Sequence, residues 1–302
     1  MQVSAGQVWR TTRTPEGPAT VHYRRCGPDV VVRAWGPGAQ VELDAVPDVL
    51  GRNDDPEGFA HDAHPVMAAA HRRFGSGWRV IRTRRVLESL VPAILEQRVT
   101  GREASAAWAR LVREFGDPAP GPAAPEVPGS ADATYAGTAS AGLAAVVSDR
   151  GHPTLFVAPD GPTWARIPSW AWHRAGVDPG HARTITTAAQ RATALEALST
   201  QPPGDAGNAL RTLPGIGVWT AAEVGVRAWG DRDAVSFGDF HLARVVVHAL
   251  TGRTDGDDAQ MAALLTPWDG QRARAVRLLV LHAGHTLPRR APRAAITDHR
   301  GW

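Results

Sequence analysis

Two stretches of the chain combine residue types that could bind an anion and act next to it. Residues 213–217 read Leu-Pro-Gly-Ile-Gly, and a helix-like run over 218–229 follows directly. Proline bars helix continuation and glycine admits close approach of another molecule, so this pattern predicts a tight hairpin between two helices. The unpaired N–H groups at the start of the second helix would point outward beside its positive end. Such an arrangement binds phosphate.

A carboxylate follows the hairpin at a defined spacing. Asp239 lies 22 residues after Gly217, at the start of the next helix-like run. An aspartate in this position is commonly only a helix N-cap. A cap explains neither the hairpin nor the spacing, whereas a carboxylate can stabilise developing positive charge or orient a water molecule. We therefore treat Asp239 as the candidate catalytic residue, which can also be a cap.

The combined pattern resembles a known family. L-P-G-I-G-x-W-T-A, followed by a loop and D-F-H-L-x-R, is similar to the helix-hairpin-helix and Gly/Pro-rich-loop signature of base-excision DNA glycosylases, the HhH-GPD superfamily. Trp219 makes the chain most similar to 3-methyladenine DNA glycosylase II. Residues 93–100, A-I-L-E-Q-R-V-T, resemble the family segment A-I-L-x-Q-x-V-S, which approaches DNA opposite the flipped base. The resemblance spans roughly residues 77–284 with one interruption.

The resemblance implies a mainly α fold, with two helical lobes around a cleft and the hairpin on its rim. Residues 1–76 are expected to form a small N-terminal β-containing domain, and 77–302 the helical glycosylase region. Within the latter, 117–152 is rich in Pro, Ala, Gly and Ser and is predicted to be a flexible linker or insertion, with a short helix at 141–148. Turn signals and periodicity predict strands at 7–12, 19–25, 29–35, 39–43 and 153–158, and helices at 65–74, 86–97, 102–115, 181–198, 206–212, 218–229, 258–265 and 272–283.

Residue-by-residue matching to the family implies a base pocket of Trp219, Trp268 and Glu223. Either tryptophan could instead be a core residue, because indoles are commonly buried. Glu223 stands where the family often has tyrosine; it could favour cationic bases or simply face solvent. Arg98 stands where some relatives insert an apolar wedge, or it is an ordinary exposed arginine. The residues implied in DNA binding are Leu213, Gly215, Ile216, Gly217, Thr220, Gln97, Arg98, His241 and Arg244.

The amino-acid composition bears on whether the protein can also cut the DNA strand and whether it can hold an iron–sulfur cluster. The chain contains 33 arginines and no lysine. Glycosylases that also cut the strand commonly form a Schiff base through lysine, and Trp219 stands where strand-cutting relatives carry that lysine. The single Cys26 excludes a four-cysteine iron–sulfur cluster and intramolecular disulfides. His282 and His285 have metal-like spacing without a further ligand nearby, so no metal is expected there.

We therefore expect a monofunctional DNA glycosylase of base excision repair, without AP-lyase activity, that flips out and removes alkylated purines of the 3-methyladenine or 7-methylguanine type. The expected partner is damaged double-stranded DNA, and no membrane association is expected. The protein is expected to be a monomer in the cytoplasm, associated with the nucleoid. No cofactor is expected; the resemblance implies that a monovalent cation could bind among the hairpin carbonyls. Two alternatives stay open: a glycosylase for uracil, thymine or oxidised bases, and a non-catalytic DNA-structure-binding protein.

Overall fold

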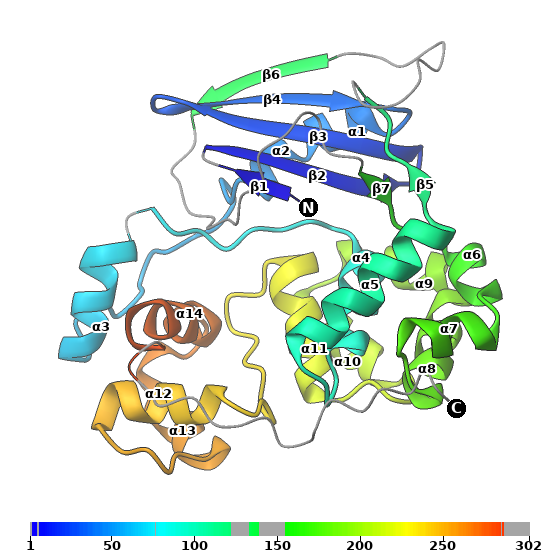
Figure 1. The fold of residues 1–302 in the computed structure, drawn as a ribbon. Helices are drawn as coiled ribbons and strands as arrows, with labels where there is room; N and C mark the ends of the chain where they lie inside the picture. Colours follow the sequence, from blue (N-terminus) through cyan, green and yellow to red (C-terminus); the bar gives the residue numbers. More distant parts are fainter. Residues whose placement is uncertain are drawn as a thin grey trace.

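A small β-sheet and two helical lobes make up the part of the chain that the computed structural model describes, residues 2–4, 6–75, 77–121, 133–138, 155–284 and 286. The sheet lies on one side of the lobes, which face each other beneath it (Figure 1). The prediction of a mainly α fold with an N-terminal β-containing part is confirmed. No helix among these residues is long and apolar enough to cross a membrane.

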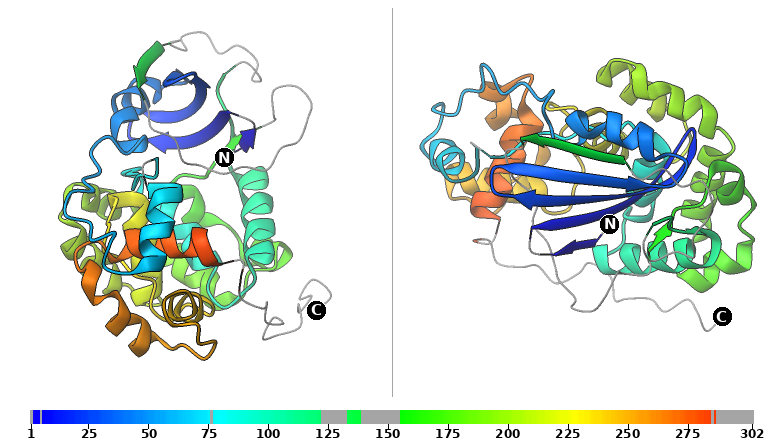
Figure 2. Two further views of the ribbon diagram at one scale, coloured as in Figure 1. Left: turned by 90° about the vertical axis from the view of Figure 1, so that its left-hand side faces the viewer. Right: turned by 90° about the horizontal axis from the view of Figure 1, so that it is seen from above.

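The sheet has five antiparallel strands in the order β1-β2-β3-β4-β6. The strands are β1 (Gln2–Ser4), β2 (Gln7–Thr14), β3 (Gly17–Cys26), β4 (Asp29–Trp35) and β6 (Ala133–Thr138). Two short helices, α1 (Ala39–Asp44) and α2 (Val46–Val49), lie along one face (Figure 2). The strand predicted at 39–43 is wrong, because Ala39, Leu43 and Val46 recur at helical spacing and are buried together against the sheet.

The segment predicted as a linker contributes to this sheet. β6 pairs with β4 from Asp29↔Thr138 to Ala34↔Ala133. A second, two-stranded pairing joins β5 (Asp117–Pro118) to β7 (Phe156–Val157), the latter inside the strand predicted at 153–158. The helix predicted at 141–148 lies outside the described residues.

The first lobe surrounds α4 (Val86–Leu95), whose Leu90, Val91 and Ile94 are fully buried at the predicted helical spacing. Around it lie α5 (Gly101–Phe115), α6 (Gly161–Arg166), α7 (Ser169–Ala175), α8 (Pro179–Ala189), α9 (Ala192–Ala197), α10 (Pro203–Arg211) and α11 (Val218–Val224). The single helix predicted over 181–198 is two helices, because α8 ends at Ala189 and α9 begins at Ala192. A π-helical turn, η3 (Gly225–Trp229), extends α11.

The second lobe combines distant parts of the chain. It contains α3 (Pro65–Ala70), its π-helical extension η1 (His71–Gly75), α12 (Leu242–Thr251), α13 (Asp258–Leu265), the 3₁₀ turn η4 (Thr266–Trp268) and α14 (Arg272–Ala283). Met67, Met261 and Leu279 are fully buried in its core. The two lobes therefore have separate apolar cores, and the chain passes from one to the other between η3 and α12.

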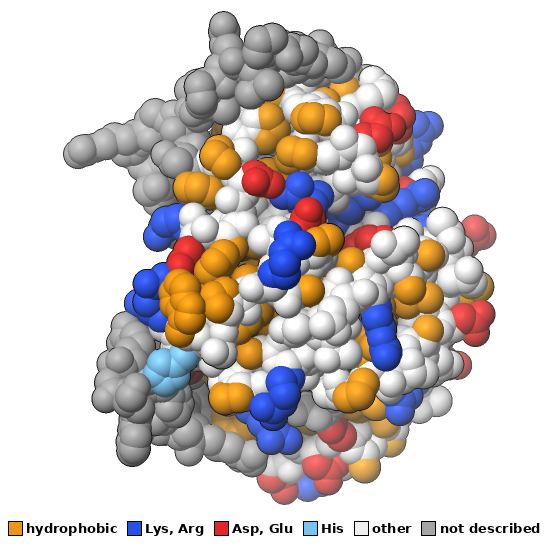
Figure 3. Space-filling model, turned by 90° about the vertical axis from the view of Figure 1, so that its right-hand side faces the viewer, with side chains coloured by type: hydrophobic (Ala, Val, Ile, Leu, Met, Phe, Trp, Pro, Cys, Tyr) orange, Lys and Arg blue, Asp and Glu red, His pale blue; other side chains and the backbone are white. Residues whose placement is uncertain are grey.

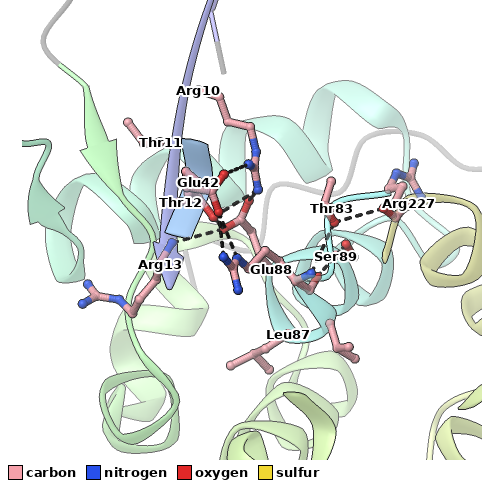
Figure 4. Close-up of polar contacts among 12 residues, drawn as sticks. Arg10, Thr11, Thr12, Arg13, Glu42, Thr83, Leu87, Glu88, Ser89 and Arg227 are labelled. Atoms are coloured by element: carbon pink, nitrogen blue, oxygen red, sulfur yellow. Dashed lines mark hydrogen bonds and ion pairs between the residues drawn. The ribbon is translucent and has the colours of Figure 1, made fainter. Parts of the chain in front are cut away.

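A buried cluster of ion pairs joins the sheet to the first lobe (Figure 4). Glu42 of α1 is fully buried; its carboxylate accepts from Arg10 of β2 at 2.6 Å and from Arg85, just before α4, at 2.7 Å. Glu88 of α4 accepts from Arg10 at 3.0 Å and from the Thr12 hydroxyl at 2.6 Å. Three segments far apart in sequence thus meet at one set of charges.

Candidate DNA-binding and catalytic site

The predicted hairpin lies between α10 and α11. Leu213 and Ile216 are each 6% exposed and belong to the core of the first lobe, so they anchor the hairpin instead of facing a ligand. Gly215 has φ +87°, and a Cβ there would lie 2.4 Å from the Thr184 hydroxyl oxygen. Gly217 is extended and exposed, and a Cβ at this position would have no other atom within 4 Å. Gly215 is therefore required by the turn itself, and Gly217 leaves room for an incoming group.

Gln97 fixes the hairpin to the turn that follows α4. Its amide nitrogen donates to the Gly215 carbonyl at 3.0 Å and to the Thr220 hydroxyl at 2.8 Å. Thr220 is buried, so both side chains serve to hold the hairpin in place. The next residue, Arg98, is exposed and has φ +58°, a conformation that non-glycine residues rarely adopt. The structure thus presents the Arg98 side chain at the tip of a strained turn beside the hairpin.

Asp239 ends a tight turn and faces α11. Its backbone N–H donates to the Ser236 carbonyl at 3.3 Å, and Gly238 between them has φ +86°, as a type II turn requires. Asp239 Oδ1 accepts from the N–H groups of His241, the N-cap residue, at 2.8 Å and of Leu242 at 2.9 Å, so it caps the start of α12 from two residues before the N-cap position. Its Oδ2 accepts from Trp219 Nε1 at 3.2 Å. The cap and the carboxylate beside the hairpin helix are therefore the same residue.

Glu223 lies one helical turn after Trp219 and has partners on both carboxylate oxygens. Oε1 accepts from the Ser236 hydroxyl at 2.5 Å, and Oε2 pairs with Arg227 at 2.6 Å. Arg227 also lies 3.9 Å from Glu96, whose pKa is raised, mainly by burial; the Arg227 guanidinium opposes this shift and the charge of Glu223 adds to it. Both carboxylate oxygens of Glu223 therefore already have protein partners. Sequence reasoning did not single out Ser236, although serine at the first position and glycine at the third position of a turn is a readable signal.

Three other predicted site residues have structural partners. Trp268 is 3% exposed in the core of the second lobe, and its indole N–H donates to the Ala60 carbonyl at 2.8 Å. His241 is exposed and contributes its backbone N–H to Asp239. Arg244 donates through Nε to the Thr254 carbonyl at 3.0 Å. Of the three predicted base-pocket residues, the structure places Trp219 in contact with Asp239 and buries Trp268 as a core residue.

A cleft of about 840 Å³ opens between the lobes. Residues of α10, α11 and the loop 230–237 line it from one side, and residues near Asp54 and Arg272 from the other. Its charges are mostly paired, as in Arg232–Asp55 at 3.2 Å. It borders the face of α11 that carries Ala221 and Ala222, whereas Trp219 and Asp239 lie outside its lining. On the face of the molecule drawn in Figure 3, the described arginines are scattered among apolar side chains and form no continuous patch.

Two carbonyls of the hairpin have protein donors: that of Leu213 accepts from the N–H of Ile216 at 3.1 Å, and that of Gly215 from the Gln97 amide at 3.0 Å. The monovalent cation expected at the hairpin stays a prediction. Elsewhere among the described residues, no three His, Cys, Asp or Glu side chains cluster as metal ligands would. His285 and the arginine-rich tail after residue 288 lie outside the described part of the chain.

Comparison with known proteins identifies the fold. No protein-family model and no curated sequence matches the chain. The 3-methyladenine DNA glycosylase of Archaeoglobus fulgidus superposes with a TM-score of 0.71 at 19% identity, over 94% of this chain and 89% of that one. The 8-oxoguanine glycosylase/lyase of Clostridium acetobutylicum, in complex with double-stranded DNA containing cytosine opposite 8-oxoguanine, gives 0.64 at 12% identity, over 92% and 89%. Mag1, a 3-methyladenine DNA glycosylase of Schizosaccharomyces pombe in complex with abasic DNA, gives 0.52 at 11%, over 72% and 90%. The chain shares the fold of these structures.

Proposed function

We propose that this protein is a DNA glycosylase that flips a damaged base out of double-stranded DNA and hydrolyses its glycosidic bond. The observation that carries the proposal is the Asp239 carboxylate, held by two backbone N–H groups and by the Trp219 indole where α11 meets the start of α12. The hairpin 213–217 lies at the same end of α11, directly before its first residue, where helix N–H groups have no partner within the helix. The fold shared with structures of DNA glycosylases supports the proposal.

In this proposal, different residues bind the DNA backbone, enter the duplex and act on the glycosidic bond. The N–H groups after Gly217 bind a backbone phosphate, and Arg98 enters the duplex beside the extruded nucleotide. As the bond from C1′ to the base nitrogen breaks, its electron pair leaves with the base, and positive charge develops on the sugar. The Asp239 carboxylate stabilises that charge and accepts a proton from the water whose oxygen bonds to C1′. No cofactor takes part in this scheme.

We further propose alkylated purines as substrates. A base that carries positive charge is already a good leaving group, so a single carboxylate can suffice. The Trp219 ring offers cation–π attraction of about 0.5–2 kcal/mol, equivalent to a factor of roughly 2 to 30 over a neutral base. The buried Trp268 and the paired Glu223 add little to this selection. The expected preference for a cationic base over a neutral one is therefore modest, which is compatible with a broad range of alkylated substrates.

The decisive experiment measures excision from duplexes that contain 7-methylguanine, 3-methyladenine, 8-oxoguanine or uracil opposite guanine. Release of the methylated purines is expected to be fastest. Trp219→Leu should slow it by more than Trp219→Phe, because phenylalanine keeps an aromatic face while both variants lose the N–H donor to Asp239. Efficient release of uracil or 8-oxoguanine alone would replace the substrate class and leave Asp239 in its role. DNA binding without release of any base would favour a DNA-structure-binding protein.

The product strand is expected to stay intact until alkali or a separate nuclease is added. Strand cutting through a Schiff base requires an amine, and the sequence contains no lysine side chain. Denaturing gel electrophoresis before and after alkali treatment measures this directly. A borohydride-trapped adduct that maps to any residue other than the N-terminal amine would contradict the expectation.

Gly217→Val is expected to weaken binding to every duplex about equally, by roughly ten- to a hundredfold, which is the loss of one charged hydrogen bond. The added side chain would occupy the open space where a phosphate must approach. Because Gly217 is extended, the fold should tolerate the change; Gly215→Val, at φ +87°, should instead lower stability. Binding titrations on several sequences decide the matter. A loss confined to one sequence would assign the hairpin to base recognition.

A further inference from the structure

One face of α11 runs beside the loop that carries Asp239, in the opposite direction. At the start of the helix, Trp219 donates to Asp239 at 3.2 Å. One turn further, Glu223 accepts from Ser236, three residues before Asp239, at 2.5 Å. Two hydrogen bonds of α11 therefore hold the two ends of a single four-residue turn.

The first and last residues of this turn, Ser236 and Asp239, are bonded to each other. Ser236 is 7% exposed, and its carbonyl accepts from the N–H of Asp239 at 3.3 Å. On the side of the second lobe, the N–H of Gly238 donates to Asp258 of α13 at 2.7 Å. The turn is thus fixed between the lobes; on the side of the first lobe, Glu223 holds its first residue and Trp219 its last.

Glu223 is suited to hold the turn and poorly suited to contact a base. Its second oxygen pairs with Arg227 at 2.6 Å, four residues further along the helix, and its side chain is 23% exposed. Arg227 fixes the rotamer of the carboxylate while leaving the other oxygen for Ser236. A carboxylate with both oxygens engaged by protein groups has lost most of its value as a free anion for an incoming ligand.

We propose that Glu223 is a positioning residue that sets the place of the Asp239 carboxylate through its hydrogen bond to Ser236. The proposal rests on the proposed function for its catalytic consequence, and on the contacts alone for its structural part. A misplacement of about 1 Å at a reacting group can cost up to about a hundredfold in rate. Loss of the hydrogen bond to Ser236 is therefore expected to lower the rate of the chemical step and to leave the affinity for DNA unchanged.

The structural part is tested by hydrogen–deuterium exchange of peptides covering 234–242 in the complete protein without DNA. Glu223→Ala and Ser236→Ala are each expected to speed exchange there by tenfold or more, which corresponds to loss of a charge-assisted hydrogen bond. Glu223→Gln should exchange nearly as the wild type does, because its amide can still bond the serine hydroxyl. Glu114→Ala removes a carboxylate from a remote ion pair with Arg174 and is the matched control. Unchanged exchange in Glu223→Ala overturns the proposal.

The catalytic part is tested by single-turnover excision and by the Kd for abasic-site duplex. Glu223→Ala and Ser236→Ala should each slow excision by about ten- to a hundredfold with an unchanged Kd, and the double variant should be no slower than either single one. Glu223→Gln should recover most of the rate. A weaker Kd or a changed order of preferred bases, with exchange at 234–242 unaltered, would show that Glu223 contacts DNA itself and would overturn the proposal. If the wild type removes no base, the proposed function fails, and the exchange measurement alone decides whether Glu223 holds the turn.

Discussion

Asp239→Asn is expected to lower the single-turnover excision rate by about 10²- to 10³-fold, the range found when one preorganised electrostatic contact to a transition state is removed. The amide oxygen can still accept from the N–H groups of His241 and Leu242, so the start of α12 is preserved. The amide NH₂ would then meet the Trp219 N–H, and two donors cannot bond each other. The substitution therefore removes the charge and one hydrogen bond but keeps the fold.

The affinity of this variant for an abasic-site duplex is expected to be equal to that of the wild type or higher, because a carboxylate repels nearby phosphates. Asp257→Asn is the matched control: Asp257 caps α13 through the N–H of Gln260 at 2.8 Å. The control should lose a comparable, small amount of stability and excise at the wild-type rate. A rate near that of the wild type in Asp239→Asn would reduce Asp239 to a helix cap.

The hairpin and Asp239 could be predicted because their signals are local. Proline and glycine set the turn within five residues, and spacing then located the carboxylate. The prediction did not reach the network around them, because Gln97 bonds to Thr220 and Glu223 bonds to Ser236 across loops whose paths no periodicity reveals. The role of Trp268 also depends on its tertiary contacts. A tryptophan can line a pocket or fill a core, and only the hydrogen bond from its indole N–H to the Ala60 carbonyl identifies Trp268 as a core residue.

In the sheet, too, the parts that depend on contacts between distant residues could not be predicted from the sequence. Strands β2 to β4 alternate in a recognisable way, whereas α1 follows a Gly-Pro-Gly turn where a further strand seemed equally compatible with the residue types. β6 comes from a stretch rich in small residues about a hundred positions after β4, and its pairing is a long-range event. Short segments with weak propensity take their conformation from the partner against which they pack.

Glu42→Gln is expected to lower the free energy of unfolding by about 3–5 kcal/mol, the largest loss of stability among single side-chain changes considered for this chain. Glu42 is fully buried between the guanidinium groups of Arg10 and Arg85, which are themselves only 9% and 10% exposed. A neutral amide keeps one acceptor oxygen, replaces the other by a donor NH₂ that one guanidinium group must face, and compensates no charge. Arg10 would then keep Glu88, at 3.0 Å, as a carboxylate partner (Figure 4), whereas Arg85 would lose the carboxylate to which it donates.

Urea unfolding followed by circular dichroism measures this loss, with Glu114→Gln as the control. The Glu114–Arg174 pair is 34% and 60% exposed, so its loss should cost between about 0 and 1 kcal/mol. The combined change Arg10→Met, Glu42→Leu and Arg85→Met should recover most of the stability, because the three most buried charges are replaced together, while Glu88 is 25% exposed to water and keeps the hydrogen bond from Thr12. Since the cluster includes no residue of the candidate site, the folded fraction of Glu42→Gln should excise at the wild-type rate. A loss below about 1 kcal/mol in Glu42→Gln would mean that water reaches the guanidinium groups, and that the sheet is joined to α4 by apolar packing instead.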